Sequence, residues 1–279
     1  MGAPDPRKNT QGQIDFRLQR QYKCYAKQDP PPDRVKPIPF QVIVQVMTIA
    51  MAANTPSLLA FADMIVIAYF YLLRPGEYTS NPSDSTPFRL CDVGLRAEHI
   101  PLDVLHGPIP TLDQTIFATL EFTTQKNAVR GEVIGLGKSH HSSICPVLSI
   151  VRRVKHLRTH NAPPTTPLAT YYHHNSWIKI LPRDITSILR DAVTFLTPAA
   201  LGFNPSDIEA RSLRAAGAMA LLCAHVDTDK IRLLGRWRSD EMFRYLHVQA
   251  EPLMRNFASK MVQGGNFVLT PNHLVPMDP

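Results

Sequence analysis

The residues that could do chemistry gather toward the C-terminal end of the chain. Arg211 and Arg214 are three positions apart, a Gly-Arg-Trp triplet follows at 235–237, and Tyr245 comes eight residues after the tryptophan. An arginine side chain offers a fixed fork of donors that matches the oxygens of a phosphate. A tyrosine hydroxyl can act as a covalent nucleophile. Together these residue types indicate chemistry on a phosphate ester.

Two further motifs lie upstream. The segment Leu-Arg-Pro-Gly-Glu places Arg74 and Glu77 directly after a long apolar stretch. An arginine at a helix end is usually a cap or an ion-pair partner. Arg74 alone is therefore weak evidence for a site, and its position upstream of Arg214 and Tyr245 is what makes the motif informative. A lysine, Lys126, lies in a predicted β-turn with the sequence Thr-Thr-Gln-Lys-Asn.

Taken in order, these motifs resemble the catalytic domain of the tyrosine recombinases, the phage integrase-like family. The sequence around Trp237 resembles the variants of this family found in eukaryotic mobile elements. The resemblance covers roughly residues 40–260 and rests on the ordered set, since each motif alone is a weak signal. It implies a catalytic set with two supporting residues, namely Arg74, Lys126, Arg211, Arg214, Trp237 and Tyr245, supported by Glu77 and Arg236.

The resemblance also implies a reaction. Tyr245 would attack a DNA phosphodiester and become a 3′-phosphotyrosine, while Arg74 and Arg214 hold the non-bridging oxygens. Lys126, with Lys138 as the alternative, would protonate the departing 5′-oxygen. Trp237 would pack against the site or donate its indole N–H. The implied activity is DNA recombination or integration on double-stranded DNA, with a possible homo-oligomer on the DNA, and it needs no cofactor or metal.

The chain departs from the family pattern in two places. Arg211 stands where the family usually has histidine, and the gap from Trp237 to Tyr245 is one residue shorter than usual, so Arg236 could share the tryptophan's role. About 39 residues precede the resembling region, which is too few for the separate N-terminal domain of the family. A fragment or a domesticated element would explain this. The alternatives are therefore a non-catalytic DNA-binding descendant and a plain helical interaction protein.

Composition agrees with a polyanionic partner without requiring one. The chain has 279 residues, with 30 Lys and Arg against 23 Asp and Glu, for a net charge of +7. The four cysteines are scattered without metal or disulfide spacing, which predicts a reducing, intracellular location, and the nucleus if the source is eukaryotic. Two pairs of adjacent histidines, at 140–141 and 173–174, are expected to point apart and have no Cys or carboxylate partner beside them in sequence, so no metal site is expected.

Positive charge is concentrated between positions 122 and 160, where the sequence has seven Lys or Arg and one Glu. A helix is predicted to open at Cys145-Pro146, with Leu148, Val151 and Val154 as its apolar stripe. Its basic residues would form a polar face that is either solvated or directed at the DNA backbone. The candidates for backbone contacts in and near this segment are Arg130, Lys138, Arg152, Arg153, Lys155 and Arg158.

The helices and strands expected from the sequence make up an α+β fold, mainly α, with a small antiparallel sheet. Expected helices cover a short segment Ile14–Tyr25, then Phe40–Ala53, the apolar stretch 57–73 with Thr55 or Ser57 as its cap, and a segment from Asp184 or Thr186 to Leu196. The stretch 171–180 is expected to be a short strand or an irregular segment. Short β-rich runs between 88 and 134 predict the sheet. We expect an N-terminal segment with a Pro-rich linker at 1–39, a catalytic domain at 40–261 and a tail at 262–279.

Three helices are expected in the segment that carries most of the chemistry. Ser206 and Glu209 have capping-box spacing for the first. Asp227 can cap the second and Gly235 can end it. Ser239 or Asp240 can cap the third, and one more helix is expected between Pro252 and Met261.

A membrane span is the competing interpretation of the apolar stretch after Pro56. Only 17 residues separate Pro56 from Arg74, and Asp63 is among them. A spanning helix needs about 20 apolar residues. A buried helix of a globular core is therefore the better prediction, and no membrane partner is expected.

Overall fold

The computed structural model describes residues 7, 13–28, 36–80, 86–123, 131–238, 242, 255 and 259. The chain divides into two compact units, Met1–Arg34 and Val35–Pro279. The first unit contains helix α1 (Phe16–Gln28), close to the helix predicted from Ile14. Apart from Met242, Arg255 and Ser259, the helices predicted after Ser239 and after Pro252 lie outside the described residues, as does the proline run at 29–35.

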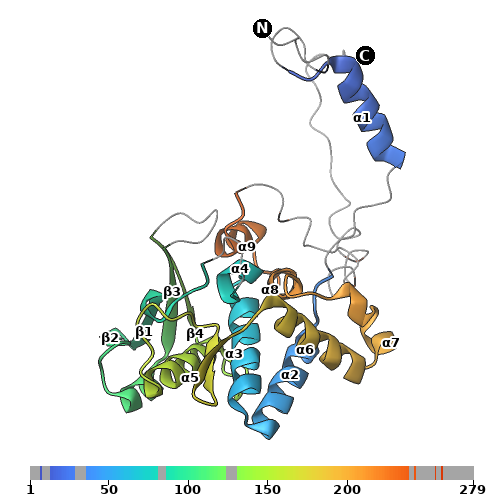
Figure 1. Ribbon diagram of the computed structural model, residues 1–279. Coiled ribbons are helices and arrows are strands. Elements are labelled where there is room, and N and C mark those ends of the chain that lie inside the picture. Colours follow the sequence, from blue (N-terminus) through green and yellow to red (C-terminus); the bar gives the residue numbers. More distant parts are fainter. Residues whose placement is uncertain are drawn as a thin grey trace, which may run out of the picture. The chain divides into compact units, whose positions relative to one another are not determined.

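The second unit is built around helix α3 (Pro56–Phe70), which is buried nearly all round, as its apolar sequence predicts. Helix α2 (Phe40–Ala53) has the predicted bounds. The hydroxyl of Thr55, one of the two predicted caps, accepts a hydrogen bond of 3.4 Å from the Leu58 N–H at the start of α3. Figure 1 shows α3 in the middle of this unit, with the sheet on one side and α2 and α6 on the other.

The predicted antiparallel sheet is confirmed. Its four strands are β1 (Val93–Ala97), β2 (Ile100–Leu102), β3 (Phe117–Phe122) and β4 (Glu132–Gly137), in the spatial order β2-β1-β3-β4. The two central strands pair with Val93 opposite Leu120, and β3 buries every second residue, as expected for a sheet with one covered face. Short 3-10 turns at Leu90–Asp92 and Ile109–Gln114 flank β1 and β3.

Helix α5 (Pro146–Thr159) lies between α3 and the sheet, packing on β3 and β4. It begins where the Cys-Pro pair predicts. A hairpin of β5 (Thr170–His173) and β6 (Ser176–Lys179) follows. For this stretch the sequence allowed either a short strand or an irregular segment. Helix α6 (Pro182–Phe195) begins two residues before the first predicted start, because Asp184 serves as its third residue and accepts from the Leu181 N–H at 2.8 Å.

The predicted capping box at Ser206 and Glu209 is wrong. After α7 (Pro198–Leu201), a 3-10 turn at Pro205–Asp207 comes first, and helix α8 begins only at Ser212 and runs to Cys223. The carboxylate of Glu209 forms an ion pair with Arg211 at 2.8 Å instead of reaching back to cap a helix.

Helix α9 (Thr228–Gly235) is capped by Asp227 as predicted, since its carboxylate accepts from the Asp229 N–H at 2.9 Å. The helix ends at Gly235 as predicted, but the glycine does not supply the left-handed residue. Arg236, not Gly235, takes the left-handed conformation, with φ +57°. Gly235 is needed for space, because a Cβ there would lie 1.6 Å from a ring carbon of Trp237.

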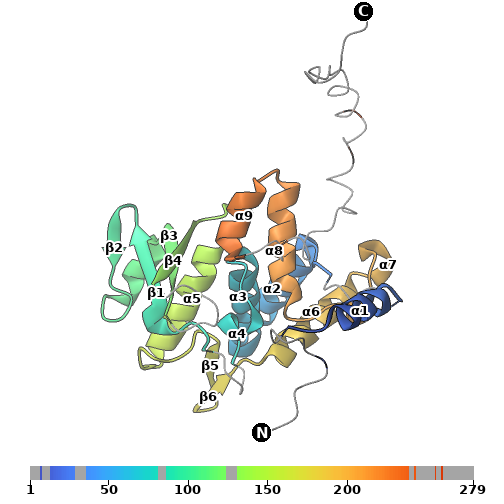
Figure 2. The same cartoon turned by 90° about the horizontal axis from the view of Figure 1, so that it is seen from above.

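Helices α8 and α9 lie side by side (Figure 2), and α8 packs against α3. Contact between α8 and α3 depends on Gly217, where a Cβ would lie 2.2 Å from the Tyr69 carbonyl oxygen. The mainly helical α+β class is thus as predicted. Within the described ranges, no helix combines the length and the apolar character that crossing a membrane requires.

Candidate functional site: an arginine cluster at the end of α3

The chain turns sharply where α3 ends. Leu72 has a left-handed backbone conformation, with φ +50°, which is uncommon for a residue with a branched side chain. This turn directs the Leu72 carbonyl toward α8 and α9, and Arg74 follows at the start of the short helix α4 (Pro75–Tyr78). Tyr78 anchors α4 by donating its buried hydroxyl to the Ala210 carbonyl at 2.8 Å.

Arg74 and Glu77 contact each other as the resemblance implies. One carboxylate oxygen of Glu77, Oε2, accepts the Arg74 backbone N–H at 2.8 Å, and the other, Oε1, accepts Nη1 of the Arg74 side chain at 3.1 Å. Glu77 is buried, whereas one third of the Arg74 side chain is exposed. The carboxylate therefore fixes the arginine at both ends and leaves part of its guanidinium accessible.

Arg214 lies in the first turn of α8 and is 3% exposed. Its Nη1 donates to the Leu72 carbonyl at 2.7 Å, and its Nη2 donates to the Gly235 carbonyl. The guanidinium carbon lies 4.1 Å from the ring centre of Trp237, which is a cation–π contact. Trp237 is itself buried, in a small apolar cluster with Leu72, Ala218, Met219, Ile231 and Met242.

Arg236 completes the group. Its guanidinium donates to the carbonyls of Tyr71 and Leu72 and to Glu77 Oε2, the last at 3.0 Å. Burial lowers the pKa of Arg236, and the neighbouring Glu77 carboxylate opposes that shift. Arg74, Arg214 and Arg236, with Glu77 and Trp237, are called the arginine cluster below.

The cluster brings together residues from segments far apart in sequence. Three guanidinium groups surround one carboxylate and one shared main-chain oxygen, so the local charge is positive. Cationic donors held in fixed positions suit the recognition of a phosphate. The Leu72 carbonyl was not predictable from the sequence, because a main-chain acceptor has no residue-type signal.

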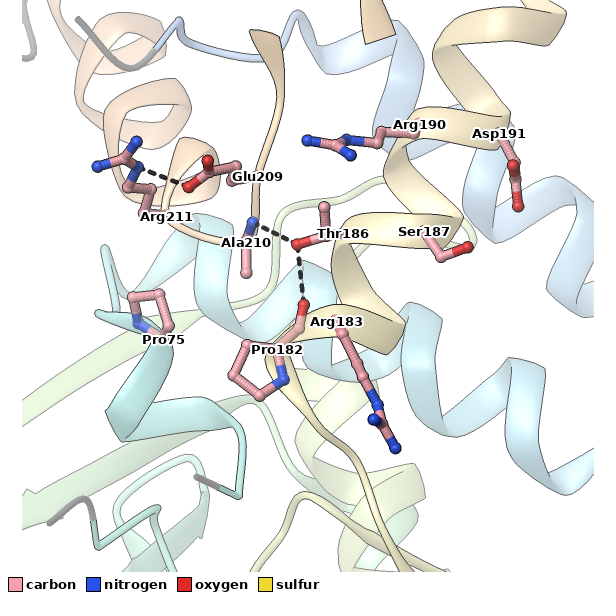
Figure 3. A pocket seen from close by; sticks show the side chains of 10 residues that line it. All are labelled: Pro75, Pro182, Arg183, Thr186, Ser187, Arg190, Asp191, Glu209, Ala210 and Arg211. Atoms are coloured by element: carbon pink, nitrogen blue, oxygen red, sulfur yellow. Dashed lines mark hydrogen bonds and ion pairs between the residues drawn. The ribbon is translucent and has the colours of Figure 1, made fainter. Parts of the chain in front are cut away.

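In the described part of the chain, Arg211 forms an ion pair with Glu209 and none with a residue of the arginine cluster. It lines a hollow of about 570 Å³ between the start of α4, the first turns of α6 and the loop before α8. Figure 3 shows Arg211 beside Glu209 on that loop, with Arg190 extending toward the loop from α6. Two carbonyls of the loop, those of Ile208 and Ser206, accept from Arg190 at 2.9 and 3.3 Å. Arg211 is thus a half-exposed residue at a polar hollow, three positions before Arg214.

Three predicted residues cannot be placed. Lys126, Arg130 and Tyr245 lie outside the described residues, so their roles stay predictions. Lys138, the alternative to Lys126, is exposed directly after β4.

The basic face predicted for α5 is only partly present. Arg153 is in the core at 2% exposure, and its guanidinium donates to the Leu168 and Thr170 carbonyls. Burial lowers the pKa of Arg153 to about 10. The prediction that Arg153 belongs to a polar face is therefore wrong, because β5 and the loop before it cover this side chain.

The other basic residues of α5 have partners within the protein. Arg152 pairs with Asp63 of α3, Lys155 with Asp113, and Arg158 donates to the Gly107 carbonyl at 2.6 Å. Burial raises the pKa of Asp63, and Arg152 opposes that shift. These arginines and this lysine connect α5 to its neighbours, so a role in contacting DNA has no support from their geometry.

Comparison with protein-family models and with curated proteins gave no match to this chain. In the part of the chain that the structure describes, no three His, Cys, Asp or Glu side chains are grouped so as to hold a metal ion. The arginine cluster is therefore the candidate site.

Proposed function

We propose that the chain cleaves and rejoins DNA strands through a 3′-phosphotyrosine, as a recombinase or integrase of the tyrosine type. The observation that carries the proposal is the convergence of Arg74, Arg214 and Trp237 at the end of α3, in contact through Glu77, Arg236 and the Leu72 carbonyl. Arginines placed in a helix-terminal motif for purely local reasons have no need to meet arginines from α8 and α9.

In the proposed reaction, the Tyr245 oxygen attacks phosphorus and its proton passes to water. The bond from phosphorus to the 5′-oxygen breaks, and Lys126 gives that oxygen a proton. Arg74 and Arg214 stabilise the charge on the non-bridging oxygens in the transition state. Attack by a 5′-hydroxyl on the phosphotyrosine reverses the steps and rejoins a strand. Because the tyrosyl phosphodiester replaces the DNA phosphodiester, no nucleotide is needed as an energy source.

Arg211 has a different role from the histidine whose place it takes. A guanidinium stays protonated at neutral pH and cannot accept the tyrosine proton. It can donate hydrogen bonds to a phosphate, and its position at the polar hollow suits a contact with the DNA backbone. We therefore expect Arg211 to contribute to binding and not to proton transfer.

A DNA-binding descendant without catalytic activity is the second candidate. Two observations favour it: Arg211 replaces a proton-transferring residue, and two donors of Arg214 are directed at main-chain carbonyls. The partner in either case is double-stranded DNA, with a possible homo-oligomer assembled on it, and an intracellular, in eukaryotes nuclear, location. The two candidates differ only in whether a covalent adduct forms.

The test uses nicked suicide substrates, on which loss of a short 5′ fragment traps the covalent complex. We expect the unaltered chain to form an adduct, and Tyr245→Phe to form none while keeping its DNA affinity. Tyr172→Phe is the matched control, since its hydroxyl only contacts Asn175 at 3.1 Å. Adduct formation by Tyr245→Phe would mean that another residue is the nucleophile.

Arg214→Ala separates cleavage from binding in a second way. It removes donors that act on the reacting phosphate, so cleavage should fall by roughly 100- to 1000-fold. Binding should weaken as well, unlike in Tyr245→Phe. If the unaltered chain binds DNA in a salt-sensitive manner but forms no adduct on any suicide substrate, the second candidate holds. An absence of salt-sensitive DNA affinity would exclude both candidates and leave an interaction protein.

A further inference from the structure

Arg236 holds a backbone conformation that glycine would adopt more easily. It follows the last residue of α9 with φ +57° and ψ +39°, the left-handed conformation in which helix C-caps commonly carry glycine. The neighbouring Gly235 does not take this position, because Trp237 needs the space where its Cβ would be. A long side chain kept at a strained position indicates that the side chain itself has a function.

The guanidinium of Arg236 contacts several separate elements. Its Nη1 donates to the carbonyls of Tyr71 and Leu234 at 3.2 and 2.9 Å, and its Nη2 donates to the Leu72 carbonyl at 3.1 Å and to Glu77. Its central carbon lies 4.2 Å from the ring centre of Phe122, the last residue of β3. Arg236 thus connects α9 with the end of α3, with α4 and with the sheet.

Two of these contacts are shared with the arginines proposed to hold the phosphate. Glu77 Oε2 accepts both from Arg236 Nη2 and from the Arg74 backbone N–H. The Leu72 carbonyl accepts both from Arg236 and from Arg214. Arg236 therefore has one partner in common with Arg74 and another in common with Arg214.

We infer that Arg236 is a positioning residue that sets the distance and orientation between Arg74 and Arg214. This inference rests on the proposed function. Two donors grip a phosphate well only at a fixed separation, and a misplacement of about 1 Å can slow a reaction by 100-fold. Arg236 hydrogen-bonds to one acceptor of Arg74 and to one acceptor of Arg214, and would thereby fix that separation before DNA binds.

Arg236→Lys tests the inference because it keeps the charge beside Glu77 but loses the planar fork. Thermal unfolding establishes that the variant is folded. We expect DNA affinity within about threefold of the unaltered chain and a single-turnover cleavage rate lower by roughly 10- to 100-fold. Arg232→Lys is the control on the same helix, since Arg232 is exposed and has only a loose contact of 3.9 Å with Asp229.

A second substrate distinguishes positioning from a general structural defect. A methylphosphonate at the cleavage position lacks one of the oxygens that the arginines are proposed to hold. If Arg236 acts through Arg74 and Arg214, Arg236→Lys should slow cleavage of this substrate less than it slows cleavage of ordinary DNA. Equal slowing on both substrates would overturn the positioning role.

A double variant covers the case in which Arg236→Lys does not fold. Glu77→Gln combined with Arg236→Met removes both charges, so no buried carboxylate is left unpaired. We expect it to fold and to cleave slowly, and a folded double variant with the parental rate would contradict the inference. If the unaltered chain forms no adduct, the proposed function fails and the positioning role fails with it. If the unaltered chain reacts and a folded Arg236→Lys reacts equally fast, only the positioning role fails.

Discussion

Helix α5 and the arginine cluster both hold arginines inside the protein, but they differ in how the acceptors are shared. On α5 each basic side chain has its own partner: Asp63 for Arg152, two carbonyls for Arg153, Asp113 for Lys155. In the arginine cluster the partners are shared, because the Glu77 carboxylate and the Leu72 carbonyl each accept from two arginines.

The difference separates an arginine used for packing from one that is a candidate for binding. Donors with separate acceptors connect α5 to each of its neighbours and spread their positive charge along the helix. Donors that crowd around the same acceptors leave excess positive charge at one point, which an anion can neutralise. A basic helix is therefore weaker evidence for a DNA surface than arginines that converge from several segments.

Replacing a core arginine of α5 should have the largest effect on stability. Arg153→Met fills a similar volume but leaves the carbonyls of Leu168 and Thr170 without this donor, at a cost of roughly 2–4 kcal/mol in the free energy of unfolding. Denaturant unfolding measures this cost. Arg183→Met is the control, because Arg183 is 82% exposed and has only a loose contact of 3.8 Å with Asp184.

The same variant sharpens the comparison of the two regions. Below its unfolding temperature, Arg153→Met should form covalent adduct at the parental rate per folded molecule, because Arg153 makes no contact with the arginine cluster. A folded Arg153→Met that binds DNA with a flatter salt dependence would instead place α5 on the DNA surface.

A smaller effect is expected from His156, also on α5. Burial, together with the charge of Arg153 and with His160, lowers the pKa of His156 to about 4, and its Nε2 accepts the Tyr172 N–H at 2.9 Å. The unfolded chain binds this proton near pH 6.5 and the folded chain only near pH 4. Protonation therefore favours unfolding, and the contribution is lost as the pH falls from about 6.5 to 4.

The expected loss is on the order of 1–2 kcal/mol, since His156 is only partly buried and solvent screens its charge. Unfolding free energies measured across this pH range in the unaltered chain and in His156→Gln provide the check. The variant should show a flatter pH dependence. Parallel curves would mean that other groups cause any acid destabilisation.

Local chemistry made much of the fold predictable from sequence. The bounds of α2, the cap at Thr55 and the buried α3 follow from apolar spacing and from single capping residues. The wrong predictions arose where one residue had two possible roles. Glu209 could cap a helix or pair with Arg211, and Gly235 could take the left-handed conformation after α9 or make room for Trp237.

The candidate site was predictable only in part. Motif spacing indicated Arg74, Glu77, Arg214 and Trp237, which the structure brings together. The burial of Arg153 was not predictable, since nothing in its position on α5 indicates that β5 will cover its side chain. The contribution of Leu72 was equally invisible, because it comes from a carbonyl and a left-handed backbone turn.

The smallest effect should come from Lys155. Its ion pair with Asp113 lies near the surface, with the Asp113 side chain 67% exposed, so Lys155→Gln should change the free energy of unfolding by only about 0–1 kcal/mol. The more useful measurement is the salt dependence of DNA affinity. Each phosphate contact contributes about 0.9 to the slope of log affinity against log salt concentration.

A lysine already neutralised by Asp113 should release no DNA counterions, so Lys155→Gln should leave that slope unchanged. Arg74→Gln should flatten it by about 0.9, because part of the Arg74 guanidinium is accessible and is proposed to contact a phosphate. Fluorescence anisotropy over a range of salt concentrations measures both slopes on one DNA. A flatter slope for Lys155→Gln with no change for Arg74→Gln would reverse the assignment, making α5 the DNA-binding surface and the arginine cluster a structural one.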